Sequence, residues 1–109
     1  VWFYPTAAGV VVSELGQATP NSGWHDSEIE ILASGEVRGR VWGLGDYISL
    51  GTASFNQWHH AAVRYLKPAG VTGTLSGFLD GVLSADTLSG GRYAPWEAEL
   101  RERRKSSRL

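Results

Sequence analysis

Glu28 and Glu30 are the pair of side chains in this sequence best placed for acid–base chemistry. They are separated by one residue in the run Ser27-Glu28-Ile29-Glu30-Ile31, where polar and apolar residues alternate. Side chains two residues apart on a strand lie on the same face, so both carboxylates are expected to project together. Retaining glycoside hydrolysis uses two carboxyl groups about 5–5.5 Å apart as nucleophile and acid/base. A hydrolase using Glu28 and Glu30 is therefore one hypothesis.

The predicted hairpin that contains these glutamates favours a structural role for them. A three-residue linker, Ala33-Ser34-Gly35, separates two alternating runs, and glycine at its last position suits a type I turn that ends in a left-handed residue. This register places Glu30 opposite Arg38. It also places Glu28 opposite Arg40, and it brings the apolar side chains together on the other face. Arginine partners lower the pKa of a carboxyl group, whereas a general acid needs a raised pKa, so a charge ladder is favoured.

The histidines are poorly spaced for a metal centre. His59 and His60 are adjacent, and neighbouring side chains on a strand point to opposite faces, so the two cannot readily share one ion. His25 stands alone in an expected loop, beside Asp26. No transition-metal site is predicted.

The five tryptophans suggest sugar stacking, because an exposed indole offers an apolar platform that a pyranose ring can cover. Trp2 and Trp58 lie in apolar, strand-like runs, so we expect both to be buried. Trp24 lies in a polar loop and Trp42 on the charged face of the hairpin, which makes these two better candidates for exposure. A mixed aromatic and polar patch is the usual anatomy of a binding site. The predicted ligand-binding patch consists of Trp24, His25, Asp26, Arg40 and Trp42.

The composition limits the classes of function. A chain of 109 residues forms one modest core, and fourteen glycines among many aromatic residues and valines are typical of short strands with many turns. A formal net charge of −1 creates no long-range field that would attract nucleic acid or an anionic membrane. The sequence has no cysteine and no apolar run as long as a membrane span. Neither nucleic-acid binding nor membrane insertion is predicted.

Short runs between clusters of glycine, proline, asparagine and serine predict an all-β chain. The expected strands cover residues 1–5, 9–15, 27–32, 36–42, 47–51, 58–65, 74–79 and 82–84. Asp80-Gly81, between the last two strands, is a strong signal for a two-residue hairpin turn. Residues 94–109 differ from the rest, because Pro95 is followed by acidic and then basic residues. They predict a short C-terminal helix or a disordered basic tail.

Several segments together resemble a known family. They are Val1-Trp2-Phe3-Tyr4-Pro5, the hairpin from Ser27 to Trp42, the run Trp58-His59-His60-Ala61-Ala62-Val63, and Phe78-Leu79-Asp80-Gly81 about fifteen residues later. Their order and spacing resemble the laminin-G-like, concanavalin A-like lectin and glucanase domains over residues 1–85. The resemblance implies an antiparallel β-sandwich of the jelly-roll type at residues 1–93. The family's last strands are not matched in 94–109, so we expect a partial sandwich with open strand edges that can pair with a neighbouring segment.

The resemblance also bears on chemistry. Glu28 and Glu30 match the nucleophile and the middle acidic position of the E-x-D-x-x-E strand motif found in related retaining glucanases. Ala33, or Leu32 in the shorter version of the motif, stands where the acid/base carboxylate is required, so a glucanase-like domain would be degenerate. Related jelly rolls often bind calcium through aspartates and loop carbonyls. This makes calcium the cofactor to test, with Asp26, Asp46 and Asp80 as candidate ligands.

The leading prediction is a non-catalytic module of a larger extracellular or cell-surface protein that binds a carbohydrate or another extracellular protein. One alternative is a degenerate glucanase-like hydrolase using Glu28 and Glu30. The other is a structural or assembly spacer whose open edges pair with a neighbouring segment. The sequence starts within an apparent strand and shows no signal peptide, so we expect it to be a segment of a longer protein.

Overall fold

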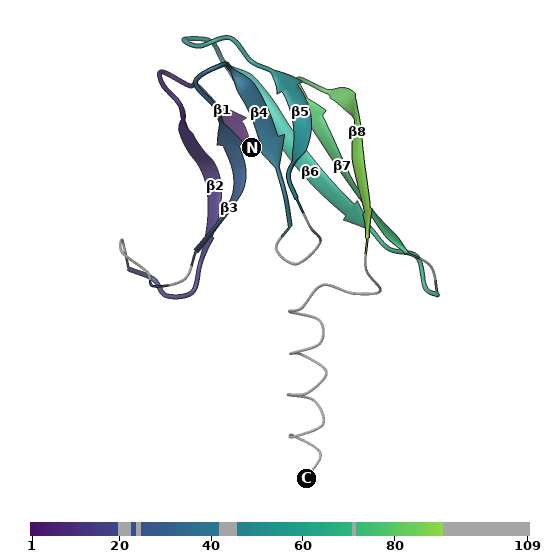
Figure 1. The fold of residues 1–109 in the computed structure, drawn as a ribbon. Helices are drawn as coiled ribbons and strands as arrows, with labels where there is room; N and C mark the ends of the chain where they lie inside the picture. Colours follow the sequence, from purple (N-terminus) through teal and green to yellow (C-terminus); the bar gives the residue numbers. More distant parts are fainter. Residues whose placement is uncertain (20–22, 24, 42–45, 71, 91–109) are drawn as a thin grey trace.

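Two antiparallel sheets of four strands each form the described part of the chain (Figure 1). The computed structural model describes residues 1–19, 23, 25–41, 46–70 and 72–90. The strands are β1 (Trp2–Phe3), β2 (Gly9–Leu15), β3 (His25–Ile31), β4 (Glu36–Gly39), β5 (Ile48–Thr52), β6 (His59–Leu66), β7 (Gly73–Leu79) and β8 (Val82–Gly90). One sheet has the order β1-β6-β7-β8 and the other β2-β3-β4-β5. Over these residues the all-β prediction is confirmed.

The strands lie close to their predicted places, but β1, β4 and β8 differ clearly in length. β4 ends at Gly39 instead of residue 42, and β3 begins at His25, which was wrongly expected in a loop. Only Trp2 and Phe3 of the first predicted strand pair with β6, because Pro5 lacks the N–H that would continue the ladder. β8 runs to Gly90 instead of residue 84, since β7 continues to pair with it as far as Gly73. The helix or tail predicted for residues 94–109 lies outside the described residues. The described residues include no helix long and apolar enough to cross a membrane.

The β3–β4 hairpin has the predicted register. Glu30 pairs with Arg38, and Gly35 has the left-handed φ of 88° that the three-residue loop requires. The N–H of Gly35 donates to the Leu32 carbonyl (2.9 Å), and the N–H of Leu32 donates to the Glu36 carbonyl (2.8 Å). Local turn chemistry therefore suffices to set which side chains face the core here.

The predicted turn at Asp80-Gly81 is also confirmed. Both residues have positive φ, 52° at Asp80 and 78° at Gly81, as a type I′ turn requires. The flanking residues Leu79 and Val82 pair with each other. Asp80 is therefore held at the end of β7, next to β6.

The hydrophobic core lies between the two sheets. Its buried members are Phe3, Ile29, Ile31, Val37, Ile48, Leu50, Ala53, Ala61, Leu75 and Leu79. Gly77 in β7 lets the sheets approach closely, because a Cβ at this position would lie 2.7 Å from Cγ of Leu50 in the opposite sheet. Gly39 in β4 plays the same part for Val63, whose Cγ1 would lie 2.6 Å from an added Cβ. Side chains of one sheet thus rest directly on the backbone of the other.

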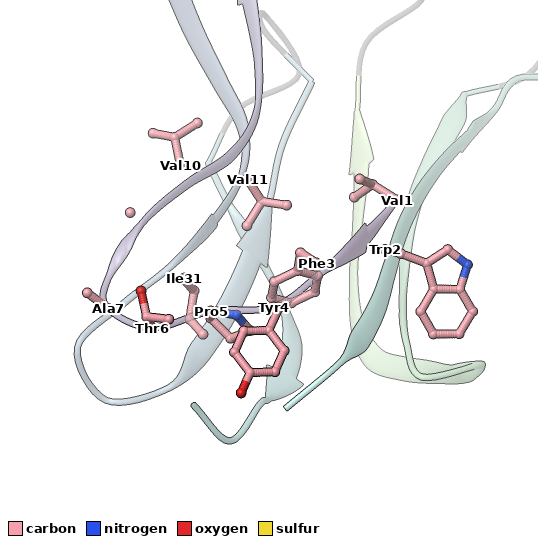
Figure 2. A pocket seen from close by; sticks show the side chains of 11 residues that line it. Val1, Trp2, Phe3, Tyr4, Pro5, Thr6, Ala7, Val10, Val11 and Ile31 are labelled. Atoms are coloured by element: carbon pink, nitrogen blue, oxygen red, sulfur yellow. The ribbon is translucent and has the colours of Figure 1, made fainter. Parts of the chain in front are cut away.

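The two sheets are joined by polar contacts on one side of the sandwich, where β5 lies beside β8 (Figure 1). The N–H of Ser49 donates to Oδ2 of Asp86 (2.7 Å), and the hydroxyl of Ser84 donates to the carbonyl of Ser49 (2.5 Å). A groove of about 310 Å³ lies between β1 and β2 (Figure 2), and its apolar lining includes Phe3 and Val11. Contacts between β5 and β8 therefore close one side of the sandwich, whereas a groove remains between β1 and β2 on the other side.

The close approach at Gly77 predicts a sharp cost for one added methyl group. We expect Gly77→Ala to destabilise the fold by about 1–3 kcal/mol, because overpacking displaces Leu50. Gly9→Ala is the matched control in a strand, since a Cβ there meets nothing within 4 Å, and its effect should stay within about 0.5 kcal/mol. Urea unfolding followed by tryptophan fluorescence measures both. An unchanged midpoint for Gly77→Ala would contradict the packing described.

Candidate functional site

The predicted ligand-binding patch lies largely outside the described residues. Trp24 and Trp42 are not among them, and only the backbone of His25 and Asp26 is described, at the start of β3. Arg40 is described, with its guanidinium carbon 4.6 Å from the ring centroid of Tyr47. The patch formed by Trp24, His25, Asp26, Arg40 and Trp42 therefore stays a prediction.

The carboxylate of Glu30 is engaged in the predicted charge ladder. Its Oε1 lies 2.5 Å from both Nε and Nη2 of Arg38, and the side chain is 16% exposed. The guanidinium of Arg38 also stacks over Tyr47, 4.1 Å from the ring centroid. The N–H of Arg40 donates to the Glu28 carbonyl (2.9 Å), which continues the register. Glu30 thus serves as half of an ion pair that links β3 to β4.

Two of the three predicted calcium ligands, Asp46 and Asp80, have hydrogen-bond partners within the protein, and the side chain of Asp26 lies outside the described residues. Oδ1 of Asp46 accepts a hydrogen bond from the N–H of Tyr47 (2.9 Å), and the carboxylate of Asp80 bonds to β6. No three His, Asp or Glu side chains of the described residues form a group that could hold a metal ion. Calcium binding through Asp26, Asp46 and Asp80 with loop carbonyls therefore stays a prediction.

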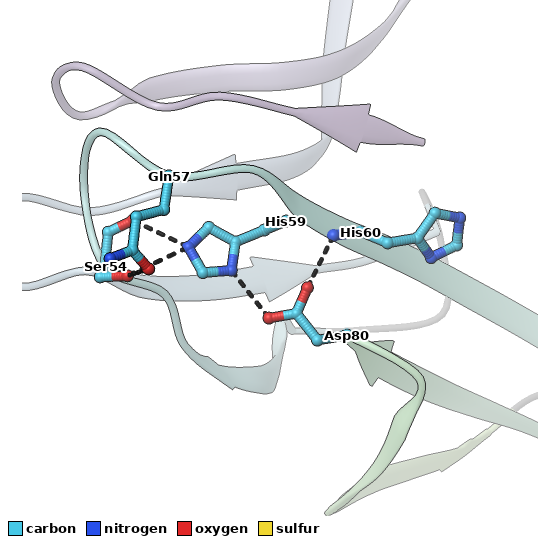
Figure 3. Close-up of polar contacts among 5 residues, drawn as sticks. All are labelled: Ser54, Gln57, His59, His60 and Asp80. Carbon is cyan, nitrogen blue, oxygen red and sulfur yellow. Dashed lines mark hydrogen bonds and ion pairs between the residues drawn. The ribbon is translucent and has the colours of Figure 1, made fainter.

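Ser54, His59 and Asp80 form a geometry that resembles a catalytic triad (Figure 3). Nδ1 of His59 lies 2.7 Å from Oδ2 of Asp80, and Nε2 lies 3.3 Å from the hydroxyl of Ser54. A serine, histidine and aspartate in this order are the parts of a nucleophilic hydrolase. Sequence reasoning missed this cluster, because its members come from separate elements and match no nucleophile motif.

The hydrogen bonds of His59 give it a structural role instead of the role of a base. We call the hydrogen-bonded set of His59, Asp80 and the Ser54 carbonyl the clamp. Nε2 lies 2.9 Å from the carbonyl oxygen of Ser54, which can only accept, so Nε2 carries a proton. Nδ1 donates to the Asp80 carboxylate, so both ring nitrogens donate, as in the imidazolium form. The hydrogen bond to Asp80 raises the pKa of this buried imidazole. The hydroxyl of Ser54 donates instead to Oε1 of Gln57 (2.8 Å), so His59 has no lone pair with which to activate it.

Asp80 completes the clamp. Its Oδ1 accepts from the backbone N–H of His60 (2.8 Å), while Oδ2 accepts from His59. The hydrogen bonds from His59 and then from His60 lower the pKa of Asp80. The N–H of Asp80 in turn donates to the His60 carbonyl (2.7 Å). The β7–β8 turn is thus fastened to β6, and through Ser54 to the loop after β5.

Four rings lie on the outer face of the sheet where β1 pairs with β6; we call this set, Trp2, Tyr4, Trp58 and His60, the aromatic ladder. The register places Trp2 opposite His60, and their ring centroids are 5.0 Å apart at an angle of 66°. Tyr4 and Trp58 form the second rung, with centroids 5.6 Å apart at 64°. Both pairs have the edge-to-face geometry that aromatic rings favour.

The prediction that Trp2 and Trp58 are buried was wrong. Each is 67% exposed, and Tyr4 is 47% exposed. Alternation explains the result: Phe3 and His59 take the inward positions, so their neighbours must project outward. Figure 2 shows Trp2 pointing to the side of β1 away from Phe3. The separate prediction that His59 and His60 face opposite sides of β6 is confirmed, since His59 is buried and His60 contacts Trp2.

A hollow of about 410 Å³ adjoins one end of the aromatic ladder. It is lined by Trp2, His60, Asp80 and Gly81. The hollow combines an indole with a carboxylate that is 47% exposed. Aromatic walls with a few placed polar groups are the usual composition of a small-molecule site. The aromatic ladder and this hollow together are the candidate functional site.

Comparison with known proteins does not identify the chain: no protein-family model, no curated protein and no solved structure matches it. The resemblance to laminin-G-like and concanavalin A-like domains therefore stays a prediction. The candidate site rests on its geometry alone.

The clamp predicts a window of pH in which the fold is most stable. The folded pKa of His59 is raised above 6.5, so its contribution is complete below pH 6.5 and is lost as the pH rises through the folded value. The folded pKa of Asp80 is lowered below 3.8, so its contribution is present above pH 3.8 and is lost as the pH falls through the folded value. Thermal unfolding across a pH series should show the highest melting temperature between these two limits. A melting temperature that rises steadily from neutral to alkaline pH would contradict the clamp.

Asp80→Asn tests the clamp directly. Asparagine tolerates the left-handed turn but has one acceptor oxygen where two are needed. We expect a loss of about 1–2 kcal/mol, at the low end for bonds to charged groups because Asp80 is half-exposed, and a flatter pH profile. Asp46→Asn is the control, since this exposed aspartate keeps an acceptor for Tyr47. Chemical unfolding at several pH values measures both, and an unaltered pH profile for Asp80→Asn would refute the assignment.

Proposed function

We propose that this chain is a non-catalytic carbohydrate-binding module. The observation that carries the proposal is the aromatic ladder, whose two indoles are each 67% exposed on the outer face of a sheet. Large exposed aromatic patches on a soluble domain mark interaction sites. A pyranose ring can cover such a surface with its apolar C–H face, which removes both surfaces from water.

The spacing of the aromatic ladder suits a chain of sugars. Residues on one face of a strand recur about every 7 Å, so the Trp2–His60 rung and the Tyr4–Trp58 rung are separated by roughly the length of one pyranose unit. Two adjacent sugars of a glycan could therefore each lie on one rung. The Trp2–His60 rung stands on the paired strands β1 and β6, and Tyr4 and Trp58 directly adjoin these strands, which supports a rigid platform.

We also propose a more specific fold class, the concanavalin A-like jelly roll, and an extracellular or cell-surface location. Two facing antiparallel sheets of four strands support a partial concanavalin A-like jelly roll at residues 1–93. Domains of that class commonly bind glycans on extracellular or cell-surface proteins, although fold analogy alone does not decide function. We infer that this chain belongs to such a protein.

Two observations support a non-catalytic role. Glu30 is paired with Arg38, and both ring nitrogens of His59 donate hydrogen bonds. The Glu30 carboxylate is therefore occupied by Arg38, and His59 has no free lone pair with which to act as a base. Aromatic platforms also stack nucleic-acid bases, but those sites combine stacking with a positively charged groove, and a carboxylate borders this ladder.

A second candidate function is assembly through the open side of the sandwich. The groove between β1 and β2 has a mixed lining that includes Thr6 and apolar residues, among them Val10, which is 54% exposed (Figure 2). Edge strands beside an apolar groove can pair with an added strand. Concentration-dependent association in sedimentation experiments would favour this function, and a monomer at all concentrations would count against self-assembly.

Substitutions in the aromatic ladder should weaken carbohydrate binding. We expect Trp2→Ala and Trp58→Ala each to weaken binding to a soluble polysaccharide about tenfold, since a ring contact contributes about 1.4 kcal/mol. Leu66→Ala is the control, because this exposed residue lies at the far end of β6. Affinity electrophoresis against a panel of glucans, mannans and galactans measures the effect. A folded chain that retards on none of them, or ladder variants that bind as the wild type does, would refute the proposal.

A further inference from the structure

We infer that the hollow lined by Trp2, His60, Asp80 and Gly81 is a subsite for an uncharged pyranose, so that this module selects neutral over anionic glycans. The inference rests on the proposed function, because it names the class of sugar that the same site takes. It goes beyond the aromatic ladder, since stacking alone does not distinguish a neutral sugar from an acidic one.

The hollow has the size and walls that one sugar needs. Its volume of about 410 Å³ lies at the lower end of the range for small-molecule sites. Trp2 supplies the apolar wall. Gly81 supplies no side chain, and an added Cβ there would meet nothing within 4 Å, so the turn leaves the hollow open. The aromatic ladder continues from Trp2 toward Tyr4, so a glycan could lie on the ladder with one unit in the hollow.

Asp80 supplies two hydrogen-bond acceptors. The protein uses one acceptor site on each carboxylate oxygen, for the ring of His59 and for the N–H of His60. An ionised carboxylate has about four such sites, so each oxygen of this half-exposed group keeps one for a ligand. Two neighbouring acceptors match two adjacent hydroxyl groups of a pyranose, both of which can donate.

His60 adds the hydrogen-bonding nitrogens of its imidazole to the acceptors of Asp80. Its ring stands edge-to-face with Trp2, and within the described part of the chain its only hydrogen bonds are made by its backbone. The imidazole therefore offers a donor and an acceptor to a ligand. A sugar hydroxyl both donates and accepts, so it is suited to this ring.

The charge of the lining favours neutral sugars. Its described residues include one carboxylate and no lysine or arginine. The imidazolium of His59 is already bonded to Asp80 on the inner side of β6, and the guanidinium of Arg64 lies over Phe78, 5.3 Å from the ring centroid. A uronate or sulfate in the hollow would meet the Asp80 carboxylate with no lysine or arginine in the lining to pair with it, and like charges at short range repel.

The experiment compares polymers that share a backbone and differ in charge. Hydroxyethylcellulose is paired with carboxymethylcellulose, and methyl-esterified pectin with de-esterified pectin. In affinity electrophoresis at low salt and neutral pH, we expect the wild type to bind the neutral member of at least one pair tenfold or more tightly. Equal binding within every pair, or tighter binding to the anionic members, would overturn the inference.

Two variants locate the selectivity. Asp80→Asn, assayed well below its melting temperature, should bring the ratio of neutral to anionic binding toward one. His60→Phe retains a ring against Trp2 while removing the hydrogen-bonding nitrogens, so it should weaken neutral binding severalfold with the fold intact. Wild-type ratios in both variants would overturn the subsite.

The two proposals fail in different ways. If Trp58→Ala abolishes binding while the Asp80 and His60 variants behave as the wild type, the aromatic ladder binds carbohydrate and the subsite is wrong. If the folded wild type binds no polymer of either charge, the proposed function fails and the subsite fails with it.

Discussion

The hydrogen-bonded pair of His59 and Asp80 is the interaction on which both faces of the β1-β6-β7-β8 sheet depend. His59 is buried in β6, where it is the register partner of Phe3 in β1, and the two ring centroids are 5.8 Å apart. A buried imidazolium is costly unless it is paired and hydrogen-bonded, and here Asp80 and the carbonyl of Ser54 satisfy both ring nitrogens. The same carboxylate reaches the outer side of the sheet, where it borders the hollow beside Trp2. The His59–Asp80 ion pair therefore satisfies a buried ring in the core and also positions a carboxylate at the surface hollow.

The aromatic ladder is a product of the register that closes the core. β1 has only two paired residues, but flanking backbone bonds hold it: the N–H of Ala61 donates to the Val1 carbonyl (2.9 Å), and the N–H of Asn56 donates to the Pro5 carbonyl (2.7 Å). Because alternate residues face opposite sides, placing Phe3 in the core obliges its neighbours to stand outside. Two exposed tryptophans carry a cost in water, which is recovered when a ligand covers them.

The two sheets are linked by hydrogen bonds on one side of the sandwich and separated by a groove on the other side. This difference determines where a ligand or an added strand could bind. β5 and β8 are linked by hydrogen bonds of Ser49, and Gly77 lets Leu50 pack against the backbone of β7. Between β1 and β2 there is a groove instead. The aromatic ladder lies on the outer face of β1 and β6, and the groove on the inner side of β1. Trp2 and Tyr4 of the aromatic ladder also line this groove, so ligand binding and strand addition would involve the same short strand.

Local rules in the sequence determined the eight strands, the register that pairs Glu30 with Arg38, and the turn at Asp80, because turn chemistry and alternation act over a few residues. The patch centred on Trp24 and Trp42 remains a prediction. Tertiary structure alone decided that Trp2 and Trp58 are exposed, and that Ser54, His59 and Asp80 meet. In an apolar run such as Val1 to Tyr4, the sequence does not determine which alternate side chains face the core. Their orientation depends on how the second sheet packs against this strand. Contacts between distant segments carry no local signature, which is why the clamp and the hollow could be found only in the folded chain.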